Sequence, residues 1–131
     1  QEALSRNKIK NDCSFHIING FISNKNLGLI NQNKGKGYGT TFIDDNSSNI
    51  KIYNLKDIER KYDIRFNVLI ADCEGFLERF FDENPDFYKQ LRLIIFEADY
   101  PEKCDYDKIR NMLIKYKFKK IIHGHQNVYM K

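Results

Sequence analysis

The chain has 131 residues, a formal net charge of +4 and 31% charged residues, which is enough length for one domain with a buried core. Its acidic and basic residues are interspersed, so we expect no nucleic-acid partner. No stretch approaches 18 apolar residues and the first ten residues lack a signal-peptide pattern, so we expect a soluble, cytoplasmic protein with no membrane partner. Three cysteines without a C-x-x-C pair (Cys13, Cys73 and Cys104) are typical of a reducing compartment.

The N-terminal half is expected to contain only short elements. Residues 24–49 are mostly polar and predict a β-hairpin insertion or loop within a single domain that spans residues 1–131. The other expected elements are a helix end over Glu2–Lys10, β-structure over Ser14–Ser23, short strands at Leu27–Ile30, Thr40–Ile43 and Ile50–Tyr53, and a helix at Leu55–Arg60.

The central stretch runs from Phe66 to Phe81. Residues 67–71 (NVLIA) form a nearly continuous apolar run, which predicts a strand buried on both faces of a parallel sheet. Asp72, Glu74 and Gly75 follow directly, and a helical pattern begins at Phe76. Ligands of open α/β sheets bind beyond the carboxyl ends of the strands, so Asp72 and Glu74 are candidate site residues. Alternatively, Asp72 caps the helix and Glu74 interacts favourably with its dipole.

The C-terminal half predicts an alternation of helix and strand. The expected elements are a helical piece at Asp86–Leu91, an apolar strand at Arg92–Phe96, an amphipathic helix at Tyr106–Tyr116, and two hairpin strands at Ile121–His123 and Asn127–Met130. This order predicts an α/β fold with a mainly parallel sheet and a C-terminal antiparallel hairpin.

Right-handed crossovers place the strands that begin at Asn67 and Arg92 side by side. Asp72, Glu74, Glu97 and Asp99 would then gather at one edge of the sheet. Three interpretations stay open for these carboxylates: they are helix caps and solvated turn residues, they bind a divalent cation, or one of them is a general base or holds a substrate hydroxyl. His123 and His125 lack a third His or Cys ligand, so we expect no metal there.

A family resemblance adds to this interpretation. Residues 70–78 (IADCEGFLE) resemble the K-I-D-V-E-G-x-E signature of the FkbM-type S-adenosylmethionine-dependent O-methyltransferases. Four further segments resemble that family's motifs in the same order: Leu4–Asn11, Ile18–Ser23, Tyr53–Ile58 and Ile94–Glu97. The family usually has Lys shortly before the central Asp, whereas residues 69–71 are Leu, Ile and Ala here, and Cys73 stands where Val or Ile is common.

The resemblance implies a Rossmann-like class I methyltransferase sheet and methyl transfer from S-adenosylmethionine to a hydroxyl of a small molecule or sugar. It implies that Asp72 is the base or orients the acceptor, with Glu74 and Glu97 in support. Asn19, Gly20 and Phe21 would flank the adenine, and Asp72 would also contact the cofactor. No metal is implied.

Class I methyltransferases also carry a Gly-rich loop after their first strand, which this chain is expected to lack, so the sheet is expected to be N-terminally incomplete. Missing N-terminal strands or another chain would then cover the open edge of the strand at Asn67. The glycine cluster at Lys34–Gly39 lies between polar and β-favouring residues and predicts a flexible turn, although Lys34 and Lys36 could hold an anionic substrate. The alternative function is a non-catalytic structural or interaction module derived from a methyltransferase.

Overall fold

A computed structural model describes residues 15–31 and 40–131 of the chain, and its fold is mixed α/β. The predictions for Glu2–Lys10 and Lys34–Gly39 lie outside the described residues. The predicted elements that lie within them are present, with shifted ends.

The main sheet has four strands in the order β5-β6-β8-β7. Their bounds are Val68–Ala71 for β5, Leu93–Glu97 for β6, Lys119–Ile122 for β7 and Gln126–Met130 for β8. The strands β5 and β6 are parallel, with Ala71 opposite Phe96, which confirms the predicted pairing. The strands β7 and β8 form an antiparallel pair, and β8 also pairs antiparallel with β6, so the predicted C-terminal hairpin is confirmed.

Two smaller sheets precede the main one. In the first, β1 (Phe21–Ile22) pairs parallel with β4 (Ile52–Tyr53); in the second, β2 (Leu27–Asn31) pairs antiparallel with β3 (Thr40–Asp44). The strand expected over Ser14–Ser23 is therefore much shorter than predicted. Among the described strands two pairs are parallel and three are antiparallel, so the expectation of a mainly parallel sheet is wrong for this part of the chain.

Local sequence signals fix the helix ends. The Asn54 side chain accepts a hydrogen bond from the Lys56 N–H at 2.9 Å at the start of α2, and the Asp105 side chain accepts one from the Lys108 N–H at 2.9 Å at the start of α5. Pro85 follows the end of α3 and prevents its continuation. The helices are α2 (Leu55–Tyr62), α3 (Leu77–Glu83), α4 (Phe87–Gln90) and α5 (Tyr106–Lys115).

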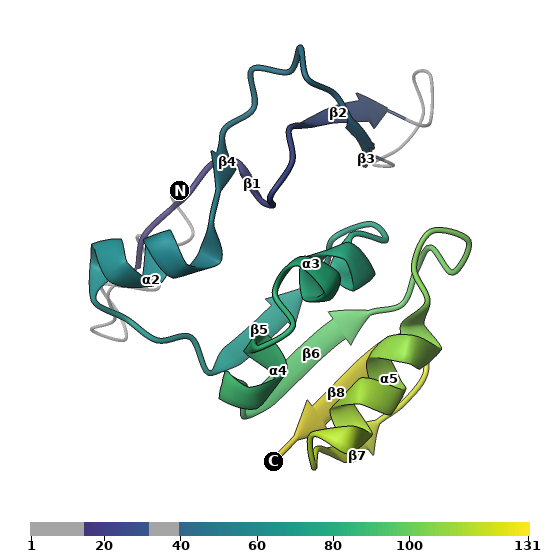
Figure 1. Cartoon of the computed structure of the whole chain (residues 1–131). Helices are drawn as coiled ribbons and strands as arrows, with labels where there is room; N and C mark the ends of the chain where they lie inside the picture. The colour runs from purple at the N-terminus through teal and green to yellow at the C-terminus, as the bar shows by residue number, and fades with distance from the viewer. Residues whose placement is uncertain (1–14, 32–39) are drawn as a thin grey trace.

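The core lies between one face of the main sheet and the three C-terminal helices. Figure 1 shows α3, α4 and α5 on the same side of this sheet. On the sheet, Ile94, Phe96 and Tyr129 are at most 1% exposed. The helices bury Leu77, Phe81, Leu91, Ile109 and Leu113 against them. This packing fixes the carboxyl ends of β5 and β6, where the candidate site residues follow.

The other face of the sheet is uncovered by any described element, and β5 lies at its edge with β6 as its one described neighbour. Ile70 is 73% exposed and Val68 is 45% exposed, so the prediction that this strand is buried on both faces is wrong. An apolar run without alternation indicates two buried faces only where both faces have something to pack against. Among the described residues no helix has the length and apolar character needed to cross a membrane.

Candidate functional site

The site is built on the turn that joins β5 to α3. The Phe76 N–H donates to the Cys73 carbonyl at 2.9 Å, and Glu74 and Gly75 take left-handed conformations with φ of 51° and 87°. A side chain at Gly75 would lie 3.0 Å from Cβ of Lys103, so the turn requires glycine both for its conformation and for its packing. Phe76 occupies the N-cap position of α3 and makes no side-chain hydrogen bond to the helix. Asp72 therefore does not cap this helix, and the interpretation of Asp72 as a solvated turn residue stays open beside a functional one.

Three of the four predicted carboxylates meet at this turn. Asp72, Glu74 and Asp99 each offer an oxygen atom, and these oxygens lie within 4.8 Å of one another. The Tyr106 hydroxyl donates to Oδ1 of Asp99 at 3.1 Å, and a hydrogen bond with Glu74 raises the pKa of Tyr100. These two phenols account for the positions of Glu74 and Asp99, and we assign no metal ion to the group.

Asp72 differs from its two neighbours. Its side chain is exposed and makes no hydrogen bond or ion pair with another described residue. It also lies on the wall of a cavity, described below. It is thus the least occupied of the three carboxylates and the best placed to accept a hydrogen bond from an external hydroxyl group.

The fourth carboxylate, Glu97, does not belong to this group. The register places position 97 next to position 72, but the chain leaves β5 at Asp72, whereas Glu97 remains in β6 opposite Gln126. Its Oε1 contacts Nε2 of His125. Glu97 thus contacts a different partner, and the expectation that it supports Asp72 stays a prediction.

A cavity of about 410 Å³ lies between the edge of β5 and the β2–β3 hairpin. Its lining is mostly apolar and includes Leu29, Phe42, Phe76, Phe80 and Leu69. Asp72 and Glu74 line it from β5 and the turn, and Gly20 and Phe21 line it from the N-terminal segment. Three of the four expected cofactor-binding residues thus share one cavity.

The fourth, Asn19, lines a different cavity of about 590 Å³ together with Tyr53 and Tyr62. Gly20 has a structural explanation of its own. A Cβ atom there would lie 2.2 Å from the Lys51 carbonyl oxygen and 2.7 Å from the Tyr53 ring, so β4 itself passes too close for a side chain. Gly20 is required for packing whether or not a ligand binds.

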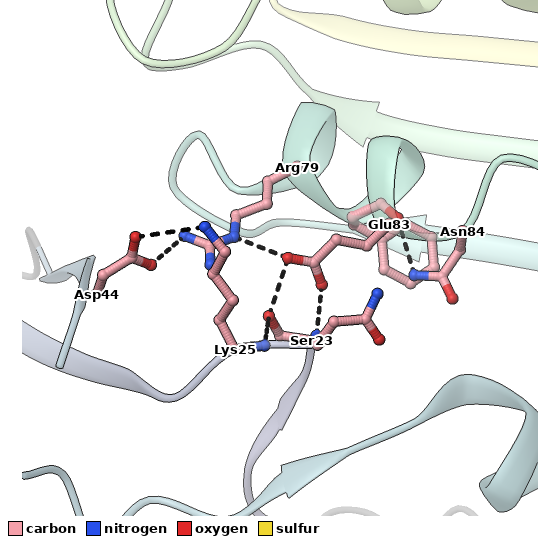
Figure 2. A network of polar contacts seen from close by, with 8 residues as sticks. Ser23, Lys25, Asp44, Arg79, Glu83 and Asn84 are labelled. Atoms are coloured by element: carbon pink, nitrogen blue, oxygen red, sulfur yellow. Dashed lines mark hydrogen bonds and ion pairs between the residues drawn. The ribbon is translucent and has the colours of Figure 1, made fainter. Parts of the chain in front are cut away.

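A network of polar contacts holds the N-terminal strands against α3 (Figure 2). Arg79 on α3 donates to Glu83 at 2.9 Å and to Asp44, at the end of β3, at 2.6 Å. Glu83 in turn accepts from the Ser23 hydroxyl at 3.1 Å and from the Asn24 N–H at 2.7 Å. The network fixes the far wall of the 410 Å³ cavity relative to the turn. Sequence reasoning missed it, although the i, i+4 spacing of Arg79 and Glu83 is a signal for an ion pair.

The two described cysteines are not activated nucleophiles. Burial raises the pKa of Cys73 to about 12, and burial likewise raises the pKa of Cys104. Both thiols therefore stay protonated at neutral pH. The candidate acid–base groups at this turn are therefore the carboxylates.

No family model, curated protein or solved structure matches this chain in comparisons with known proteins.

Proposed function

We propose that this chain carries the acid–base site of an S-adenosylmethionine-dependent O-methyltransferase, which acts on a hydroxyl of a small molecule or sugar. The observation that carries the proposal is Asp72, an exposed and unpartnered carboxylate at the carboxyl end of β5, on the wall of an apolar cavity. The strand order β5-β6-β8-β7, with its antiparallel terminal hairpin, supports a Rossmann-like, class I interpretation of the α/β fold.

Asp72 accepts the proton of the acceptor hydroxyl, because a general base needs a free carboxylate within hydrogen-bonding reach of that group. Glu74 and Asp99 flank it and can accept hydrogen bonds from further hydroxyls of a sugar. The apolar residues on the cavity wall exclude water from one side of the site. When bound, S-adenosylmethionine supplies an electrophilic methyl group.

The described residues fit this cofactor only in part. Phe21 and Phe42 offer aromatic surface and Asp72 a carboxylate, but the described glycines form no cradle. Gly20, Gly28 and Gly75 each pack against atoms of the chain itself. We therefore propose that a glycine-rich segment, supplied by further strands or by another chain along the open edge of β5, completes the cofactor site.

A second candidate is a non-catalytic interaction module. The exposed apolar side chains of β5 favour it, because such an edge is suited to pairing with another strand. The two candidates differ in whether Asp72 is required for any turnover.

The test measures transfer of a labelled methyl group by the natural polypeptide that contains these residues, with a panel of sugars and small alcohols. We expect Asp72→Asn to lower kcat by about 100-fold or more, with little change in the acceptor KM, because asparagine cannot take up the proton. Asp63→Asn, which makes the same chemical change at the exposed end of α2, serves as the control and should keep full activity.

Unchanged turnover in folded Asp72→Asn would remove the catalytic role of this residue. Absence of methyl transfer to every acceptor would favour the interaction module.

A further inference from the structure

Five cations gather at the end of the main sheet opposite the candidate site. Arg92, Lys115, Lys117, Lys119 and Lys120, here called the basic end, are all exposed, and none forms an ion pair with a described residue. The segment KYKFKK, residues 115–120, concentrates four lysines in six positions, and no acidic residue follows Asp107 in the sequence. The expectation that the positive charge is evenly interspersed is therefore wrong for this segment.

The fold brings these residues together from three elements. Lys119 on β7 lies opposite Met130, which lies opposite Leu93, the residue after Arg92. Lys115 ends α5, and Lys117 lies in the turn that leads to β7, with φ of 70°. Figure 1 shows the end of α5, the start of β6 and the C-terminus at the same end of the sheet. The carboxylates Asp72, Glu97 and Asp99 lie at the opposite end of the sheet.

Exposed aliphatic side chains adjoin the basic end. Ile121 is 55% exposed, Ile122 is 52% exposed and Met130 is 48% exposed. The pairing of β7 with β8 shifts register between Lys120 and Ile122, which interrupts the edge of the sheet. Lysine on an edge strand also protects against aggregation, but this explanation does not cover Arg92, Lys115 and Lys117, which lie outside β7.

Charge and apolar surface together indicate the partner. Unpaired cations attract an anionic surface, and aliphatic side chains next to them gain from entering the boundary between lipid headgroups and acyl chains. Single-stranded nucleic acid would instead use exposed aromatic rings for base stacking, whereas Phe118 is buried and Tyr116 is partly buried here.

We propose that the basic end docks the protein on an anionic phospholipid membrane surface, with Ile121, Ile122 and Met130 at the depth of the headgroups. The candidate site at the opposite end of the strands then faces away from the membrane and stays open to solution.

The experiment is co-sedimentation of the 131-residue chain with vesicles of phosphatidylcholine alone and with the same vesicles containing phosphatidylserine. We expect binding only to the anionic vesicles, and loss of that binding as salt is added. Lys119→Gln/Lys120→Gln should lower the partition coefficient about 30-fold, since each lysine near an anionic surface contributes about a fivefold factor. The matched control is Lys56→Gln/Lys61→Gln on α2, which removes the same charge from two exposed positions and should bind like the unmodified chain.

A second pair of variants separates lipid from other polyanions. Ile121→Ser should weaken vesicle binding several-fold, whereas Ile43→Ser, an exposed isoleucine on β3, should not. Equal binding to both kinds of vesicle, no binding to either, or no effect of the lysine substitutions in folded protein would each overturn the proposal. Tighter binding to single-stranded RNA, unaffected by Ile121→Ser, would overturn it in favour of a nucleic-acid partner.

Discussion

At the scale of single residues, the carboxylates of this protein divide by the partners that hold them. Glu74 and Asp99 are fixed by tyrosine hydroxyls, Glu97 by a histidine and Glu83 by an arginine. Asp72 has no such partner among the described residues. A carboxylate without a partner on the wall of a cavity is available to a ligand. The spacing of the carboxylates in the sequence does not reveal this difference between Asp72 and its neighbours.

Glu83 shows how a carboxylate with several hydrogen-bond partners contributes to the stability of the fold. Burial by itself raises the pKa of Glu83, but the hydrogen bonds from Arg79, the Asn24 N–H and Ser23 outweigh it and hold the pKa below the usual 4.5. A lowered pKa in the folded state means that the stabilisation is complete above pH 4.5 and is lost as the pH falls below it.

We therefore expect Glu83→Gln to lower the free energy of unfolding by about 2 kcal/mol at neutral pH. The difference from the unmodified chain should shrink in acid, below pH 4.5, as the native carboxylate also takes up a proton. Urea unfolding at the two pH values measures this difference. Glu102→Gln, at an exposed position, is the control and should leave the free energy of unfolding unchanged at both pH values. A constant difference at both pH values would contradict the assignment.

At the scale of elements, β5 is central to the fold yet lies at an edge of its sheet. Leu69 and Ala71 pack toward the helices, while Val68 and Ile70 lie on the uncovered face. On the neighbouring strand, Ile94 is completely buried. Ile70 and Ile94 lie on paired strands, yet Ile70 faces solvent and Ile94 lies in the core.

We expect Ile94→Ala to lower the free energy of unfolding by about 3 kcal/mol, because it leaves a cavity in the core. Ile70→Lys should change it by no more than about 0.5 kcal/mol, because that side chain is already mostly in water. It should also reduce self-association, since a lysine on an edge strand opposes pairing with another strand. Denaturant unfolding and size-exclusion chromatography over a range of concentrations measure the two effects.

Ile114→Lys on α5, where the isoleucine is 58% exposed, is the control and should leave self-association as it is. A large loss of stability in Ile70→Lys would mean that this face of β5 is covered in solution.

At the scale of the whole molecule, the described residues contain the candidate carboxylates and a cavity beside them. The cavity beside β5 is open along the strand edge, and the described glycines form no cradle for a cofactor. A site completed by another segment binds weakly without that segment, since the contacts it would supply are missing.

We therefore expect the 131-residue chain alone to bind S-adenosylmethionine weakly or not at all in a calorimetric titration. A micromolar dissociation constant for the isolated chain would contradict this expectation. It would mean that the residues around the 410 Å³ cavity suffice to hold the cofactor.

The sequence by itself determined the succession of elements and the chemistry at their ends. The apolar runs before Asp72 and Glu97 predicted two neighbouring strands, and the spacing of Ile109, Met112 and Leu113 predicted α5, because local periodicity reflects which face of an element is buried. The acidic turn at residues 72–75 could be identified in the same way, since charge directly after an apolar strand marks its end.

Only the tertiary structure decided which of these residues meet. Periodicity does not reveal whether a second layer exists, so the exposure of Ile70 could not be predicted from an apolar run. The contact of Glu97 with His125 depends on the pairing of β6 with β8. The basic end depends on the end of α5 and the starts of β6 and β7 lying at the same end of the sheet. These arrangements bring together residues that are far apart in the sequence. They depend on how whole helices and strands pack, which the local pattern of apolar and polar residues does not specify.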